Sequence, residues 1–69
     1  MTNLREERES RGITQTAVAS ALGISRQTYM KYEENPQIMP VYQAQAACNF
    51  IGCDIRDIFF GKKVSKTHA

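Results

Sequence analysis

Apolar residues recur along the chain at spacings of three and four residues, which is the pattern of helices that bury one face. Val18 and Leu22 would share one face of a helix, and Tyr29 and Tyr32 would share one face of the next. Alternation with a period of two is scarce, and no turn dipeptide joins two β-branched runs, so a sheet is not expected. The pattern predicts an all-α fold.

Capping residues and breakers divide the chain into five short helices. Asn3 precedes the first, with Glu6 three residues later as in a capping box, and Gly12 would end it. The other four each begin after a capping residue or with a proline, and each ends at a breaker: Gln15–Leu22 between Thr14 and Gly23, Arg26 to about Glu34 between Ser25 and Asn35-Pro36, Pro40–Ile51 before Gly52, and Asp54–Phe60 before Gly61.

The second and third predicted helices are joined by the short link Leu22-Gly23-Ile24-Ser25. Ala19 is small where the two helices would cross, and Gly23 can adopt the positive φ that a tight turn requires. Ile24 can fill the angle between the helices, and Ser25 can cap the second of them. This order of residue types predicts a helix-turn-helix.

From Leu4 to Phe60 the chain resembles the helix-turn-helix regulators of the phage repressor and Cro type (XRE-like). The resemblance implies a compact five-helix bundle like the lambda repressor DNA-binding domain, whose third helix docks in the major groove and which usually binds operators as a dimer. We expect residues 1–61 to form this domain and residues 62–69 to be a basic, flexible tail. The matching residues are Gly12-Ile13-Thr14-Gln15, Val18-Ala19, Leu22-Gly23-Ile24-Ser25-Arg26-Gln27-Thr28, Glu33, Ile51-Gly52-Cys53-Asp54-Ile55 and Ile58-Phe59.

Three departures from the family pattern bear on affinity more than on fold. The family commonly has Asn-Gly followed by basic residues after the third helix, whereas this chain has Glu34-Asn35-Pro36-Gln37. Ala17 replaces the usual capping-box acid, and Glu7 stands where a core leucine is common. We therefore expect weaker contacts with the phosphate backbone of DNA.

The net charge of +2 is unevenly distributed over the 69 residues. Residues 1–34 carry five basic and five acidic side chains, and residues 35–60 carry one basic and two acidic ones. The remaining excess lies in Lys62, Lys63 and Lys66, which either contact phosphates or only aid solubility. An argument for nucleic-acid binding must therefore rest on the helix pattern and not on bulk charge.

The third predicted helix carries the candidate base contacts. The resemblance places the family's base-reading positions at Arg26, Gln27 and Lys31, and Met30 could touch a thymine methyl group. Arginine pairs with the guanine O6 and N7 atoms and glutamine with the adenine N6 and N7 atoms, so both residue types suit the role. The alternative is an ordinary solvated polar helix face.

Phosphate contacts are expected at Gln15 and Thr16, where the unpaired N–H groups of a helix start favour an anion. Ser25 is first of all a helix cap, and any phosphate contact would be secondary. The resemblance also implies a structural ion pair between Arg8 and Glu33 beneath the recognition helix, with two separate surface charges as the alternative.

The last predicted helix contains more apolar residues than one core position needs. Phe59 matches a core position of the family, which leaves Ile58 and Phe60 either as a dimer contact or as further core residues. The residues expected to be largely buried are Val18, Leu22, Ile24, Tyr29, Val41, Ala44, Ile51, Ile55 and Phe59.

Other classes of function find little support in the sequence. Cys48 and Cys53 with the single histidine, His68, cannot complete a four-ligand zinc site, so we expect buried free thiols, no metal and no cofactor. No catalytic Ser/His/Asp or Cys/His set and no glycine-rich phosphate loop is present, so an enzyme is not expected. No apolar run of 18 residues and no signal peptide appears, and we expect a cytoplasmic protein without a small-molecule effector.

The leading interpretation is a transcriptional regulator that binds double-stranded DNA at a palindromic operator as a homodimer. The alternative is a protein-interaction module of the same fold, such as an antitoxin or anti-repressor.

Overall fold

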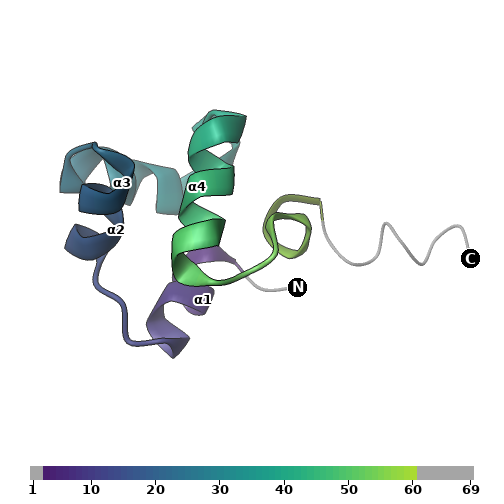
Figure 1. Cartoon of the computed structure of the whole chain (residues 1–69). Coiled ribbons are helices and arrows are strands. Elements are labelled where there is room, and N and C mark those ends of the chain that lie inside the picture. Colours follow the sequence, from purple (N-terminus) through teal and green to yellow (C-terminus); the bar gives the residue numbers. More distant parts are fainter. Residues whose placement is uncertain (1–2, 61–69) are drawn as a thin grey trace, which may run out of the picture.

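Helices form all the regular structure of residues 3–60, the part of the chain that the computed structural model describes (Figure 1). None of these helices is long and apolar enough to cross a membrane. The elements in chain order are α1 (Leu4–Ser10), α2 (Gln15–Leu22), α3 (Arg26–Glu34), the 3-10 turn η1 (Pro36–Ile38), α4 (Val41–Ile51) and the wide π-type turn η2 (Arg56–Phe60).

The predicted caps begin the first three helices. Asn3 and Glu6 form a complete capping box, in which the Asn3 carboxamide oxygen accepts a 2.8 Å hydrogen bond from the Glu6 N–H and the Glu6 carboxylate accepts one from the Asn3 N–H. Thr14 caps α2, and Ser25 caps α3 by accepting a 3.1 Å bond from the Thr28 N–H. These bonds pair N–H groups that a helix start otherwise leaves without partners.

The second half of the chain differs from the sequence expectation in three details. Pro40 lies just before α4 as its cap residue and not in its first turn. The stretch Pro36–Ile38 forms a 3-10 turn where only a connection was expected. The last element begins at Arg56 and not at Asp54, because the Asp54 carboxylate accepts a hydrogen bond from the Arg56 N–H and so acts as a cap.

Gly23 makes the tight turn between α2 and α3 possible. Its φ of +73° is left-handed, and its N–H donates to the Ala19 and Ser20 carbonyls while the Ile24 N–H also donates to Ala19. α2 packs against both α3 and α4 (Figure 1). Because the turn at Gly23 joins α2 to α3, it determines the direction in which α3 follows α2.

The core lies where α2, α3 and α4 meet, with α1 packed against α4. Val18, Tyr29, Ala44 and Ile51 are buried as predicted. Four other predicted core residues are only partly buried and pack against the cluster: Leu22, Ile24, Ile55 and Phe59. Cys48 is buried as expected, Ala19 is buried at the helix crossing, and Ile58 takes the core alternative. The buried core residues for which the sequence analysis made no prediction are Leu4, Met39 and Ala47.

Val41 was predicted to be buried, and this is wrong, because its side chain is 78% exposed. The inward face of α4 is formed by Ala44, Ala47, Cys48 and Ile51. At 3.6 residues per turn, Val41 lies roughly 70° from the centre of that face. Val41 is therefore at the edge of the inward face, and in the first turn of α4 its side chain is left exposed to solvent.

We predict that Gly23→Ala lowers the free energy of unfolding by about 1–2 kcal/mol, because a Cβ is disfavoured in the left-handed conformation. An added Cβ would meet no atom within 4 Å, so the cost comes from the backbone and not from a clash. Urea unfolding measures the effect. Gly23→Asn is the control and should lose less, because asparagine adopts this conformation more readily; equal stability of the alanine variant and the wild type would contradict the assignment.

Candidate nucleic-acid interface

α3 has one buried side and one open side. The Tyr29 side chain is fully buried in the core and holds the helix on the domain. Arg26, Gln27 and Lys31 lie on the opposite side, and all three are exposed. A helix anchored by an aromatic ring thus presents two cations and a carboxamide to solvent.

The side chains of Arg26, Gln27 and Lys31 make no hydrogen bond or ion pair with any other residue between 3 and 60. This sets them apart from the arginines of α1, each of which is paired with a glutamate. Within the described part of the chain, nothing occupies the donors and acceptors that they would offer to a ligand.

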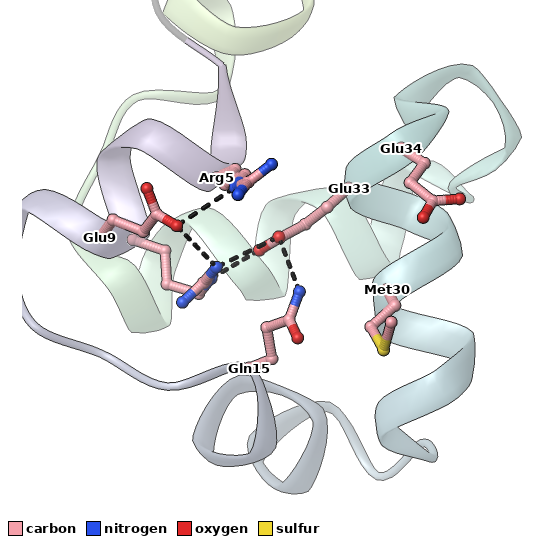
Figure 2. A pocket seen from close by; sticks show the side chains of 7 residues that line it. Arg5, Glu9, Gln15, Met30, Glu33 and Glu34 are labelled. Carbon is pink, nitrogen blue, oxygen red and sulfur yellow. Dashed lines mark hydrogen bonds and ion pairs between the residues drawn. The ribbon is translucent and has the colours of Figure 1, made fainter.

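Met30 points toward a hollow beside α3 and is half-buried (Figure 2). The hollow has a volume of about 330 Å³ and lies between α1, the start of α2 and the second half of α3. Its wall carries more carboxylates than guanidinium groups, so it does not favour a phosphate inside it. The lining residues are Arg5, Arg8, Glu9, Gln15, Met30, Glu33 and Glu34.

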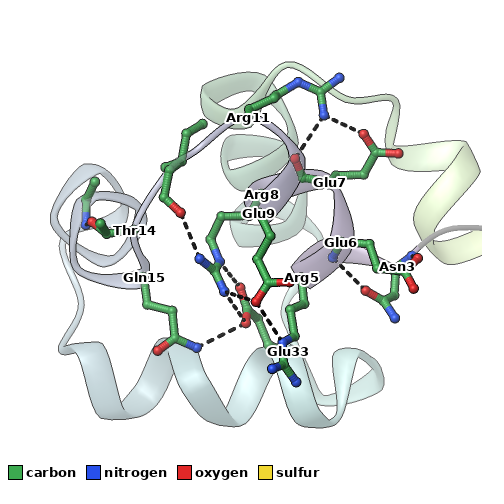
Figure 3. Close-up of polar contacts among 12 residues, drawn as sticks. Asn3, Arg5, Glu6, Glu7, Arg8, Glu9, Arg11, Thr14, Gln15 and Glu33 are labelled. Carbon is green, nitrogen blue, oxygen red and sulfur yellow. Dashed lines mark hydrogen bonds and ion pairs between the residues drawn. The ribbon is translucent and has the colours of Figure 1, made fainter.

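The start of α2 lies beside this hollow. Thr14 caps the helix through the Ala17 N–H, and the first N–H groups, those of Gln15 and Thr16, have no place in the helical ladder. The Gln15 side chain donates one N–H to the Glu33 carboxylate at 3.1 Å (Figure 3). A carboxamide nitrogen carries two hydrogens, so a second donor remains.

The Ser25 hydroxyl is occupied within the domain. It accepts a hydrogen bond from the Thr28 N–H and donates one of 2.9 Å to the Thr28 side-chain oxygen. Its cap role is therefore observed, and a phosphate contact would require it to give up its bond to the Thr28 hydroxyl.

Arg8 and Glu33, 25 positions apart in the chain, meet in a two-pronged ion pair (Figure 3). The Arg8 Nε and the Glu33 Oε2 are 2.6 Å apart, and the side chains are only 9% and 3% exposed. Arg8 also donates a 2.7 Å hydrogen bond to the Ile13 carbonyl. One guanidinium group thus ties α1, the link before α2, and α3 together.

The surroundings of the pair keep Glu33 charged. Burial acts to raise the pKa of the Glu33 carboxyl, but the hydrogen bonds from Arg8 and Gln15, with the Tyr29 hydroxyl nearby, outweigh it and hold this pKa below its usual value. Burial and the neighbouring Glu33 raise the pKa of Tyr29 far above its usual value, so its hydroxyl stays neutral. That hydroxyl is itself buried without a well-formed hydrogen bond among the described residues.

The surplus apolar surface expected on the last helix is not found at Ile58. Its side chain is 6% exposed and belongs to the core cluster, because η2 folds back against the domain, so Ile58 is not available as a dimer contact. The Phe60 side chain and the tail residues Lys62, Lys63 and Lys66 lie outside the described part of the structure.

The cysteines are free thiols that adjoin one another at the end of α4. Cys48 is buried and Cys53 is half-buried, and the Cys53 N–H donates to the Cys48 carbonyl across the turn at Gly52. Burial raises the pKa of both thiols, that of Cys48 to about 12, which makes them poor nucleophiles. No group of three or more metal-ligating side chains occurs among residues 3–60.

Two contacts near the site were not anticipated. Gln15 reaches Glu33 from 18 positions away, and Arg11 reaches the Gly52 carbonyl at the end of α4 from 41 positions away. Neither separation leaves a signal in a single sequence. The Glu7–Arg11 ion pair, in contrast, has the helical spacing of four that could have revealed it.

We predict that Arg8→Met lowers the free energy of unfolding by about 3–5 kcal/mol, because it leaves the buried Glu33 carboxylate without its counter-ion. The double variant Arg8→Met/Glu33→Leu should recover most of this loss, because it removes both buried charges. Thermal or urea unfolding of the wild type, Arg8→Met, Glu33→Leu and the double variant measures the coupling free energy between the two side chains.

Arg5→Met is the matched control for this prediction. Arg5 and its partner Glu9 are 66% and 53% exposed, so its loss should cost less than about 1 kcal/mol. If Arg8→Met/Glu33→Leu loses as much stability as Arg8→Met and Glu33→Leu lose together, the idea that Arg8 and Glu33 act as a unit is refuted.

A comparison with known families agrees with this geometry. The profile of the helix-turn-helix family matches residues 4–58, which span α1 through most of η2. No curated protein and no solved structure matches the chain significantly. The match covers the helical pair with its Gly23 turn and the ion-paired scaffold around it. The chain therefore belongs to the helix-turn-helix family, in its phage repressor and Cro type, and is a DNA-binding regulator of that general class.

Proposed function

We propose that this chain binds double-stranded DNA in a sequence-specific manner, with α3 in the major groove, and so regulates transcription. The observation that carries the proposal is the open side of α3, where the side chains of Arg26, Gln27 and Lys31 are exposed and bond to no other residue of the described range 3–60, while Tyr29 anchors the opposite side. A recognition helix needs this division, because its N-terminal side chains must reach base edges while its apolar side stays on the domain.

Within this proposal, Arg26 and Gln27 read bases from the first turn of α3. Arginine can donate two hydrogen bonds to guanine, and glutamine can both donate to and accept from adenine. Lys31, one turn after Gln27, contacts a further base or a nearby phosphate. Met30 is half-buried, so only the exposed part of its side chain can touch a thymine methyl group.

Phosphate contacts in the proposal come mainly from the start of α2. The N–H groups of Gln15 and Thr16 and the remaining Gln15 carboxamide N–H can donate to one phosphate oxygen. Glu33 holds the Gln15 side chain in place, and Arg8 neutralises Glu33, so the carboxylate repels the phosphate less. Ser25 would be a minor contact, because its hydroxyl already bonds to Thr28.

We further propose that two copies bind a palindromic operator in the cytoplasm. A two-fold dimer on one face of the duplex would place its half-sites about 34 Å apart, one helical turn. No effector is needed for this mode of regulation, since protein concentration and dimerisation can control occupancy.

A second candidate is a protein-interaction module of the same fold. The observation that favours it is the surplus of one carboxylate in the hollow beside α3: Arg5 and Arg8 pair with Glu9 and Glu33, and Glu34 adds a further negative charge next to the proposed DNA face. Selection from random duplex DNA separates the two candidates: an enriched palindrome supports the regulator, and no enrichment supports the module.

We predict that Arg26→Ala and Gln27→Ala each weaken binding to the selected site by roughly 1–3 kcal/mol and relax selectivity at one or two base pairs. Repeating the selection with each variant measures both effects. Gln15→Ala is the comparison and should weaken all sequences about equally, because a phosphate contact carries no base information. An unchanged motif for both α3 variants, with the fold intact, would remove α3 from the recognition role.

We also predict a shallow dependence of binding on salt. Each phosphate neutralised contributes about −0.9 to the slope of log K against log salt concentration, and few basic side chains are free on the proposed DNA face. Fluorescence anisotropy at several salt concentrations gives the slope. A slope as steep as about −10 for two copies, or no salt dependence at all, would contradict this distribution of charge.

A further inference from the structure

The outward side of α4 is uncharged and carries large apolar side chains. Val41, Tyr42 and Phe50 are 78%, 72% and 47% exposed, and α4 has no charged residue along its 11 positions. The exposed positions between them are Gln45, Ala46 and Asn49. α1, in contrast, fills its exposed positions with charged residues and one serine. A monomer of this size seldom leaves such a side open to water.

The side chains on this face are arranged in a row of large, small and large. Tyr42, Ala46 and Phe50 are spaced by four residues, so they form one ridge along the helix surface. The small Ala46 in the middle lets another helix approach closely. Val41, Gln45 and Asn49 form the neighbouring ridge, and a groove lies between the two rows.

We propose that this face binds the same face of a second copy, with the two α4 helices crossing in antiparallel directions at Ala46. Tyr42 of each copy then packs against Phe50 of the other, as two-fold symmetry requires. The proposal deepens the homodimer proposed above by naming its surface, which lies on α4 and does not use the buried Ile58.

Self-complementarity favours a second copy over an unrelated partner. A charged partner surface would find no counter-ion on α4, whereas a copy brings an equally uncharged one. Gln45 and Asn49 already share a 3.0 Å hydrogen bond and keep further donors and acceptors, so the same pair on a second copy can match them.

The size of the face fits a weak dimer. A tyrosine or phenylalanine contributes about 150–250 Å² when buried, so the exposed parts of Tyr42 and Phe50 supply roughly 500 Å² over two copies. With Val41 and the amide side chains around them, the total approaches the lower end of specific interfaces, near 1,000 Å². We therefore expect association in the micromolar range, strengthened when two copies bind adjacent half-sites.

Sedimentation of the whole chain without DNA, at concentrations up to about 1 mM, tests the first part of the proposal. Wild type should dimerise, and Ala46→Glu should raise the dimer dissociation constant at least about tenfold, because two carboxylates would face each other at the symmetry axis. Ala21→Glu makes the same change at an exposed position of α2 and should leave the constant unchanged. Circular dichroism checks that both variants stay folded.

A charge exchange tests the pairing itself. Tyr42→Lys alone and Phe50→Glu alone should each weaken the dimer, whereas the double variant should regain affinity, because each lysine would face a glutamate of the other copy. Within one chain the two positions are two helical turns, about 12 Å, apart, so the rescue cannot arise inside a monomer. Recovery in the double variant supports the antiparallel crossing.

Several results would overturn the proposal: a monomeric wild type at every concentration, dimerisation unaffected by Ala46→Glu, or no rescue in the double variant. A monomeric wild type would mean that the outward face of α4 does not bind a second copy and is left for another protein.

Binding of Ala46→Glu to a single selected half-site separates dimerisation from DNA recognition. Wild-type affinity there, with lost cooperativity on the full site, supports both proposals, whereas no DNA binding by either protein counts only against the regulator function.

Discussion

One buried carboxylate, that of Glu33, connects the elements on which the proposed interface depends. It receives two hydrogen bonds from Arg8 on α1 and one from Gln15 on α2, and it belongs to α3 itself. Burial of this charge is unfavourable by itself, so its position is stable only while these donors surround it. The hydrogen bonds to Glu33 therefore hold α1, α2 and α3 at defined relative positions. Each of these helices is too short to be stable alone.

This constraint explains how so small a domain can present a helix precisely. Tyr29 fills the core beneath α3, and the Arg8–Glu33 pair lies near the far end of the same helix. The Gly23 turn sets the near end through its hydrogen bonds to the last turn of α2. With both ends and the middle held, the side chains of Arg26 and Gln27 project from a rigid support, which is what recognition of base edges requires.

The surface of the domain divides into regions of different chemistry. α1 is covered by paired charges, the open side of α3 carries polar groups without a partner among the described residues, and the outward side of α4 carries no charge at all. Paired charges suit a surface that stays in water, unpaired cations suit a polyanion, and an uncharged apolar face suits another apolar face. The proposed regulator function uses the second region, and the proposed dimer uses the third.

The sequence by itself determined the first three helices, the turn between α2 and α3, and the family. Helix starts depend on contacts within three or four residues, as at Asn3 and Ser25, and a left-handed turn depends on one glycine, so this information is local. The pairing of Arg8 with Glu33 was implied only by resemblance, because residues 25 positions apart leave no local signal of contact. Spacing predicted the buried Val18, Tyr29, Ala44 and Ile51, but only the tertiary structure decided the burial of two other apolar residues: Ile58 folds into the core, while Val41 at the edge of the inward face of α4 is left in solvent. Periodicity gives the face of a helix, but the packing of neighbouring helices decides how much of that face is covered.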